Sequence, residues 1–400
     1  MAIAESGQGR RAEEASIWSW LHRREGRQII GQIIIVVLLA ALFWIAATNA
    51  IDNLRRQNIA SGFGFWNNTA GFDISQALIP YSATSTYGQA FWVGLLNTLL
   101  VSVIGIVLAT IVGFVMGIAR LSNNWLIARL ATVYVEVARN VPLLLQLFVW
   151  YFALIPQLPL PRQSWQLPAG VVLNNRGLSL PAPVLQPDAG IVLATLALAI
   201  AASIGLRFWA NRRWKATGER FPVFWTSLGL IVGLPLVVAA ALGFPVTFQY
   251  PELKGFNYSG GIVVLPEFIA LLAGLVFYTG AFIAEIVRSG IQGVSSGQKE
   301  AARALGLTNN QMLKLVVIPQ AMRIIIPPLT SNYLNLTKNS SLGVAIAYPD
   351  LVSVFAGTVL NQTGQAIEVI SITMLVYLTL SLATSAFMNW FNARMKLVER

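Results

Sequence analysis

The sequence contains no cysteine and a single histidine, His22, which lies in a charged N-terminal segment. Without cysteine there is no disulfide framework and no thiolate ligand for a metal. With one histidine outside every apolar run, imidazole cannot supply buried acid–base chemistry. These absences argue against a metal or thiol enzyme. A non-transport membrane scaffold or enzyme is therefore the weakest of the functional hypotheses for this chain.

Charged residues are also scarce, at 11% of 400, whereas 56% of the residues are hydrophobic and the mean hydropathy is +0.65. Soluble globular domains carry about 25% charged residues. No GxxxxGK[ST] phosphate-binding loop occurs in the sequence, so the chain lacks the usual means of hydrolysing ATP. The composition is typical of an all-α polytopic membrane protein without a nucleotide site of its own.

Long apolar runs predict the membrane-spanning helices, because a bilayer core requires roughly 20 consecutive apolar residues in a helix. We expect about eight spans, at 29–48, 90–118, 131–155, 189–206, 222–243, 266–287, 324–346 and 366–390. The first run is longer than the core of a signal peptide, which indicates a retained span. The seventh is the weakest, because Lys338, Asn339 and two serines interrupt it.

The basic residues predict the orientation of these spans. With eight spans, both termini lie on one side, and most of the 27 Lys and Arg residues fall on that side, including five in the 207–221 loop. Cytoplasmic loops carry the excess of Lys and Arg. We therefore expect both termini in the cytoplasm, and the net charge of +11 indicates membrane topology rather than a nucleic-acid partner.

One cytoplasmic loop, between the sixth and seventh spans, contains the amphipathic segment EAARALGLTNNQMLKLVVIP, from Glu300 to Pro319. Ser295 with Gln298 and Thr308 with Gln311 each fit a capping box. Gly306 follows the first predicted helix in the position that favours a left-handed backbone, and Pro319 is expected to end the second helix. The segment therefore predicts two short helices joined at a glycine turn.

The side chains of this segment favour contact with another protein. Ala301 and Ala302 would let another surface approach closely, Glu300 presents a carboxylate, and Leu307 adds apolar surface. An exposed apolar patch of this kind usually marks a protein interface. An amphipathic helix lying at the membrane surface is the alternative.

The same segment resembles the EAA loop of ATP-binding cassette importer permeases. The run YTGAFIAEIVRSGIQGVSSGQKEAARALGLTNN, with IPQAMRIIIPPLTSNYLNLTKNSSL after it and EVARNVPLLLQLFVWYF before it, is similar to the polar amino-acid uptake family. Small departures occur at Asn140, Val316, Ile318 and Ser340. The resemblance implies that the loop docks on a separate cytoplasmic ATPase dimer, which holds ATP and magnesium, and that this chain needs no cofactor. It assigns ATPase coupling to Glu300, Ala301, Ala302, Gly306, Leu307 and Pro319.

The resemblance covers 90–155 and 266–390, which implies a five-helix permease core. The expected organisation is a cytoplasmic segment 1–28, an extra first span 29–48, a periplasmic loop 49–89, the first part of the core 90–155, an insert 156–265 with two spans, the second part of the core 266–390 containing the coupling loop 290–320, and a cytoplasmic tail 391–400. This long form resembles the Q-type permease of general L-amino-acid importers. It implies a bacterial inner-membrane location, a second homologous permease as heterodimer partner or else a homodimer, and a periplasmic amino-acid-binding protein.

Ionisable residues at the cytoplasmic ends of two spans are further candidates, because charge at membrane depth is costly. Glu136 and Arg139, and likewise Glu285 and Arg288, are three residues apart and could each form an ion pair along one helix. Such pairs would fix helix ends on the cytoplasmic side. Gating or substrate contact is the alternative role.

Polar residues inside the spans are candidates for the substrate path, because a zwitterionic amino acid requires both hydrogen-bond donors and acceptors. The candidates are Tyr278, Asn332, Asn335, Lys338, Asn339, Ser340, Ser341 and Gln146. Each could instead be a polar contact between membrane helices. The two main functional hypotheses are a permease subunit of an ATP-driven importer of polar or general L-amino acids, and a self-contained secondary transporter or channel for small polar solutes.

Overall fold

The computed structural model describes residues 24–56 and 61–395. Most of the predicted N-terminal segment, including His22, and the end of the predicted tail lie outside this part. Within it, seven helices are long and apolar enough to cross a membrane, and a bent helix pair brings the number to eight. The predicted helical membrane fold with about eight spans is therefore confirmed.

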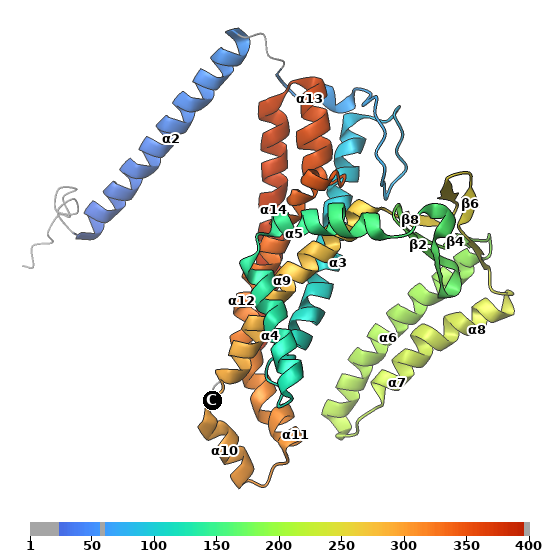
Figure 1. Ribbon diagram of the computed structural model, residues 1–400. Helices are drawn as coiled ribbons and strands as arrows, with labels where there is room; N and C mark the ends of the chain where they lie inside the picture. Colours follow the sequence, from blue (N-terminus) through green and yellow to red (C-terminus); the bar gives the residue numbers. More distant parts are fainter. Residues whose placement is uncertain (1–23, 57–60, 396–400) are drawn as a thin grey trace, which may run out of the picture.

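The first span, α2 (Arg24–Arg56), extends beyond its predicted range and has none of its apolar window buried. Figure 1 shows it apart from the other helices. A short 3-10 helix, η1 (Gly64–Asn67), leads to the second span, α3 (Tyr87–Ala119), which begins at a complete capping box between Thr86 and Gln89.

The third predicted span, 131–155, is not one continuous helix. It consists of α4 (Trp125–Asn140) and a segment from 143 to 157 at 108° to it, built from α5 (Leu143–Phe148), η2 (Val149–Leu154) and η3 (Ile155–Gln157). Val141 at the break is extended, with φ −98° and ψ 128°. Pro142 explains this conformation, because a proline disfavours helical backbone in the residue before it.

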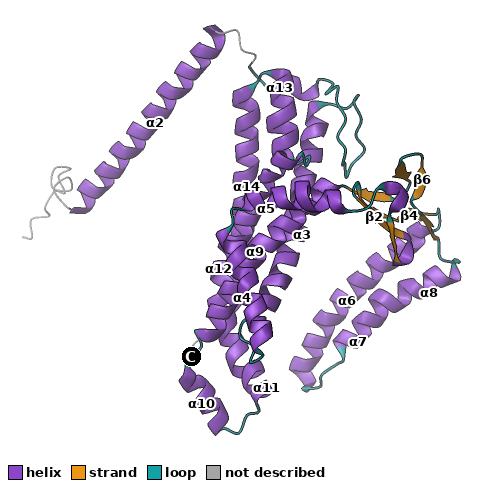
Figure 2. Ribbon diagram, in the orientation of Figure 1, coloured by secondary structure: helices purple, strands orange, loops and turns teal. Residues whose placement is uncertain are grey.

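The remaining core helices are α9 (Pro266–Gln292), α12 (Ile318–Asn339) and α14 (Ala366–Met395). The 3-10 helix η8 (Ser340–Ile346) continues α12, and a helix that the sequence did not predict, η9 (Val352–Val359) with α13 (Leu360–Thr363), precedes α14. Ala347 lies at the break with φ 60°. Figure 2 shows the core helices side by side, with α10 (Ser296–Ala304) and α11 (Asn309–Met312) at one end.

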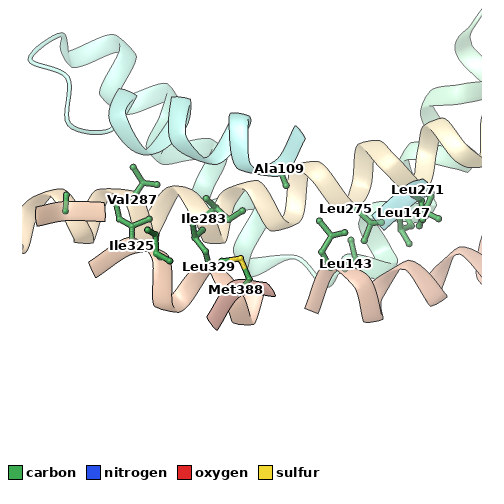
Figure 3. Packing of buried hydrophobic residues seen from close by; sticks show 14 of the residues in the cluster. Ala109, Leu143, Leu147, Leu271, Leu275, Ile283, Val287, Ile325, Leu329 and Met388 are labelled. Carbon is green, nitrogen blue, oxygen red and sulfur yellow. The ribbon is translucent and has the colours of Figure 1, made fainter. Parts of the chain in front are cut away.

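The hydrophobic core is centred on α9. A side chain at Gly117 of α3 would meet the carbonyl oxygen of Ala284 at 2.7 Å, so glycine allows the two backbones to approach closely. Ile283 and Val287 lie on this same side of α9, against α3. On the side of α12, a side chain at Gly290 of α9 would meet Ile325, so glycine brings these two helices close as well; Figure 3 shows Ile325 beside α9. This close packing fixes α9 and α12 relative to each other, and both helices carry candidate site residues.

The insert is a helical hairpin with three small sheets. The hairpin consists of α6 (Ala189–Thr217) followed by α7 (Val223–Leu228), η6 (Gly229–Gly233) and α8 (Leu234–Ala241). Short 3-10 turns, η4 (Pro161–Gln163) and η5 (Pro168–Gly170), flank the first strand. The sequence did not predict the strands that follow.

All strand pairs in the insert are antiparallel. One sheet has the order β1-β2-β3-β8, from Trp165–Leu167, Val171–Asn174, Gly177–Leu180 and Ile262–Val264; β4 (Ala182–Leu185) pairs with β5 (Val246–Gln249), and β6 (Glu252–Lys254) pairs with β7 (Asn257–Ser259). In the register of the larger sheet Leu178 lies opposite Val264. The pairing ties the two ends of the insert together beside the core (Figure 1).

Candidate functional site

The predicted glycine turn of the coupling loop is present. Gly306 has φ +73°, its N–H donates to the carbonyl of Arg303 at 2.9 Å, and the N–H of Leu307 donates to the carbonyl of Ala302 at 3.2 Å. This pair of bonds is a Schellman motif, which ends a helix and reverses the chain. The turn fixes the angle between α10 and α11.

One of the two predicted capping boxes is present. Thr308 accepts from the backbone N–H of Gln311, and the Gln311 side chain accepts from the N–H of Thr308, so α11 begins as predicted. The box predicted for Ser295 and Gln298 is wrong, since Ser295 makes no side-chain cap. The Gln298 amide oxygen instead accepts a hydrogen bond from Gln320 of α12 at 3.3 Å.

Pro319 does not end the second helix, contrary to the prediction. α11 continues through a π-helical turn, η7 (Leu313–Val317), into α12, where Pro319 occupies the first turn. Within this continuous helix Pro319 has no N–H to donate to the preceding turn, and the wider π turn directly before it makes room for the proline ring. α11 is therefore continuous, through η7, with the seventh span.

Only some of the loop residues that were predicted to contact another protein are exposed. Glu300, Ala301 and Gly306 are exposed, and Leu305 is 81% exposed. Ala302 is only 3% exposed and packs in the main core cluster. The outer face thus combines a carboxylate, small side chains and one large apolar residue, whereas the second alanine of the EAA sequence holds the loop against the core.

Five charged residues meet near the C-terminal ends of α3, α4 and α9. Glu285 is at the centre: it forms ion pairs with Arg288 at 2.6 Å, with Arg139 at 3.7 Å, and with Arg120. Arg120 also lies 3.9 Å from Glu136. The side chain of Arg120 is only 9% exposed, so its charge depends on these carboxylates.

This network corrects the pairing predicted from sequence. Glu285 and Arg288 do pair along α9, but Arg139 turns away from Glu136 toward Glu285 and lies 5.3 Å from the ring centre of Phe282. Arg120 was not among the candidates from the sequence. Its position as the first residue after the second span was the available signal, but the pairing depends on which helices are neighbours.

Four of the predicted substrate-path residues lie together. Tyr278 of α9 and three asparagines of α12, namely Asn332, Asn335 and Asn339, line one pocket of about 240 Å³, with Thr279 and Phe282. Asn332 donates to the carbonyl of Pro328 at 3.1 Å, which leaves its amide oxygen available. In the described part of the chain, the side chains of Tyr278, Asn335 and Asn339 have no hydrogen-bond partner. Such groups at membrane depth favour a water-filled or ligand-binding cavity.

The other predicted path residues lie elsewhere. Lys338 and Ser341 line a different pocket, of about 400 Å³, against Thr373 and Tyr377 of α14. Ser340 is fully buried and donates to the carbonyl of Thr337 at 2.8 Å. The structure therefore places the predicted residues of α12 on two sides of that helix.

Gln146 lies in neither pocket. Its side-chain nitrogen donates to the carbonyls of Ala138 and Val141, each at 2.8 Å. These are carbonyls that the break between α4 and α5 leaves without helical partners. The geometry gives Gln146 the role of closing the bend in the third span.

A family described as "Binding-protein-dependent transport system inner membrane component" matches residues 105–397, which include most of the core and the whole coupling loop. The chain belongs to this family. It is a permease component, and the ATPase of such importers is a separate subunit, so the chain is not itself an enzyme.

The permease is also similar to proteins that match it over nearly its whole length. It is 57% identical over 374 residues to the General L-amino acid transport system permease protein AapQ of Rhizobium johnstonii, covering 94% of this chain and 93% of that protein. It is 50% identical over 374 residues to the Putative amino-acid ABC transporter permease protein YhdX of Escherichia coli, covering 93% and 94%.

A third relative is the Glutamate/glutamine/aspartate/asparagine transport system permease protein BztB of Rhodobacter capsulatus, 43% identical over 406 residues, covering 94% of this chain and 95% of that protein. The predicted resemblance to importer permeases is confirmed, and these relatives extend it through the insert. The alternative of a self-contained transporter or channel is not favoured.

The permease contains a buried polar cluster that the sequence analysis missed, at the break after η8. The Tyr348 hydroxyl donates to the carbonyl of Asn97 at 3.1 Å, and the N–H of Leu351 donates to the hydroxyl of Thr98 at 3.0 Å. Asp350, which is fully buried, accepts from the N–H three residues later at 2.8 Å. The cluster secures the break against α3. Asn97 and Thr98, inside an apolar run, were the signal that could have found it.

Proposed function

We propose that this permease carries L-amino acids of polar or broad type across the bacterial inner membrane, through the pocket lined by Tyr278, Asn332, Asn335 and Asn339. The observation that carries the proposal is this pocket, in which Tyr278, Asn335 and Asn339 have no hydrogen-bond partner within the described residues, while α12 connects it directly to the coupling loop. Amide oxygens suit an ammonium group, and amide and hydroxyl hydrogens suit a carboxylate. The relatives are named as amino-acid permeases, which supports the same substrate class.

The proposed assembly follows from the same features. The loop around Glu300 docks on a cytoplasmic ATPase dimer, which holds ATP and magnesium, and both termini lie on that side. A second, homologous permease completes the transport path as a heterodimer, and a periplasmic binding protein delivers the amino acid. The exposed face of α10 supports the docking, because it presents a carboxylate and apolar surface without a partner in the described part of the chain.

Reversing the charge at Glu300 tests the coupling. With Glu300→Arg, we expect ATP-driven uptake of an L-amino acid into proteoliposomes, containing both permeases and the ATPase, to fall at least tenfold. The reason is that a docking carboxylate becomes a repelling cation. Lys299→Glu, a reversal of opposite sign at the neighbouring, partly buried position, is the control and should have a smaller effect. Uptake that persists without ATP, or in the Glu300 variant, would contradict the proposal.

Replacing Asn335 tests the pocket separately from the coupling. Loss of a hydrogen bond to a charged group costs about 1.5–3 kcal/mol, so Asn335→Leu should raise the KM of uptake by at least about tenfold. ATPase co-purification should stay unchanged. Lys338→Met, which alters the second pocket on α12, is the comparison. If Lys338→Met changed KM and Asn335→Leu did not, the amino acid would pass through the second pocket instead.

A further inference from the structure

The hairpin of the insert contains a groove that the transport function does not use. A pocket of about 660 Å³ lies between α6 and α7, and a second pocket of about 230 Å³ adjoins it near the turn, sharing Asn211 and Val223. The larger pocket is mainly apolar along its length, with Ile200, Ile204 and Ile231 among its lining residues. The two pockets form one groove with an apolar body and a polar end.

The polar end of the groove is strongly basic. Arg207 lines the larger pocket and Arg220 lines the smaller one. Glu219, the one acidic residue between 207 and 221, pairs with Arg213 at 2.7 Å. In the described part of the chain, neither Arg207 nor Arg220 has an acidic partner. The groove end therefore carries uncompensated positive charge and favours an anionic ligand.

Aromatic side chains place this basic end at a membrane surface. Arg213 lies 5.5 Å from the ring centre of Trp209, and Arg220 lies 5.4 Å from that of Trp214. Tryptophan and basic residues gather at the level of the lipid headgroups. The turn of the hairpin also lies toward the same end of the molecule as α10 (Figure 1). The groove thus begins at the headgroup level and continues into the hydrocarbon region.

A buried hydroxyl lies at the depth where a lipid ester would be. Ser203 lines the groove, is only 7% exposed, and its oxygen has no hydrogen-bond partner among the residues that the structure describes. It is four residues before Arg207 on α6, which corresponds to about 6 Å along the helix toward the hydrocarbon region. A polar group at that spacing below a cationic headgroup site matches the ester oxygens of a glycerolipid.

We propose that this groove binds one anionic phospholipid. Arg207, Arg220 and the Asn211 amide hold the phosphate and headgroup, Ser203 donates to an ester carbonyl, and an acyl chain lies beside Ile204 and Ile231. Basic pockets between membrane helices bind anionic headgroups in this way. The groove is accessible to lipid because α6, α7 and α8 pack mainly on one another within the chain. The proposal does not depend on which solute the permease carries.

Native mass spectrometry of the purified full-length chain tests the proposal, with phosphatidylglycerol as the probe and phosphatidylcholine of the same acyl chains as the comparison. We expect one phosphatidylglycerol to be retained in preference to phosphatidylcholine. The double variant Arg207→Gln with Arg220→Gln should weaken its retention about tenfold or more. The control, Arg212→Gln with Lys215→Gln, removes the same charge from exposed positions that line neither pocket. This variant should still retain phosphatidylglycerol.

A variant that keeps every charge separates groove binding from surface attraction. Ile204→Trp fills the apolar part of the groove and should also release the lipid, while an unchanged melting temperature in detergent shows that the chain is folded. The proposal would be overturned if the two double charge variants lost phosphatidylglycerol equally, or if Ile204→Trp retained it fully. Binding of phosphatidylcholine as tight as that of phosphatidylglycerol would also overturn it. So would release of the lipid when the complete transporter assembles, since a subunit would then occupy the groove.

Discussion

Replacing Gly306 with valine is expected to reduce ATP-driven uptake at least tenfold. Gly306 has φ +73°, and a left-handed backbone costs an ordinary residue about 1–2 kcal/mol, more for a branched one. A side chain there would meet no atom within 4 Å, so the effect comes from the backbone alone. Relief of the strain changes the angle between α10 and α11 and moves Glu300 away from its docking position. The measurement is the initial rate of ATP-dependent uptake in proteoliposomes, with ATPase co-purification alongside.

Gly218 provides a closely matched control for this variant. It also has φ +73°, follows the last residue of α6 as a helix cap, and has open space around it. Gly218→Val therefore introduces the same backbone strain in the insert, away from the coupling loop, and should leave uptake nearly unchanged. If both variants lost uptake equally, the effect would be general destabilisation and the role of Gly306 in coupling would be wrong.

The sequence predicted the spans well because a bilayer imposes one requirement on every span, a long run of apolar residues. The breaks were harder to predict. Pro142 bends the third span, whereas Pro319, Pro327 and Pro328 lie within continuous helix. Whether a proline ends a helix or is accommodated within it depends on whether the neighbouring turns can adapt. That adaptation depends on packing, which the sequence alone does not show.

The residues of the candidate site also separate into those that a local rule predicts and those that depend on the packing of distant segments. The spacing of Asn332, Asn335 and Asn339 places them on one helical face, so a local rule brings three pocket residues together. The pairing of Arg120 with Glu285 joins α3 to α9 across 165 residues, and no local rule predicts it. Likewise, β8 pairs with β3 more than 80 residues earlier, and strands of three or four residues are too short to show an alternating pattern.

Replacing Glu285 with glutamine should lower the stability of the permease and, with it, uptake. Glu285 is the common partner of three arginines, and Arg120 among them is almost fully buried. Removing one partner of a buried ion pair costs about 3–5 kcal/mol, because it leaves an uncompensated charge. Glu285 is 24% exposed, so we expect about 3 kcal/mol, the lower end of that range. Thermal unfolding of the purified chain in detergent measures the effect.

Two further variants identify the cause of that loss. Glu136→Gln removes the same charge from the same cluster, but Glu136 is 55% exposed and lies 3.9 Å from Arg120, so its effect should be small. Adding Arg120→Gln to Glu285→Gln removes the buried cation itself and should restore part of the lost stability. If the double variant were less stable than Glu285→Gln alone, then packing of the arginine stem, rather than its unpaired charge, would hold α3 against α9.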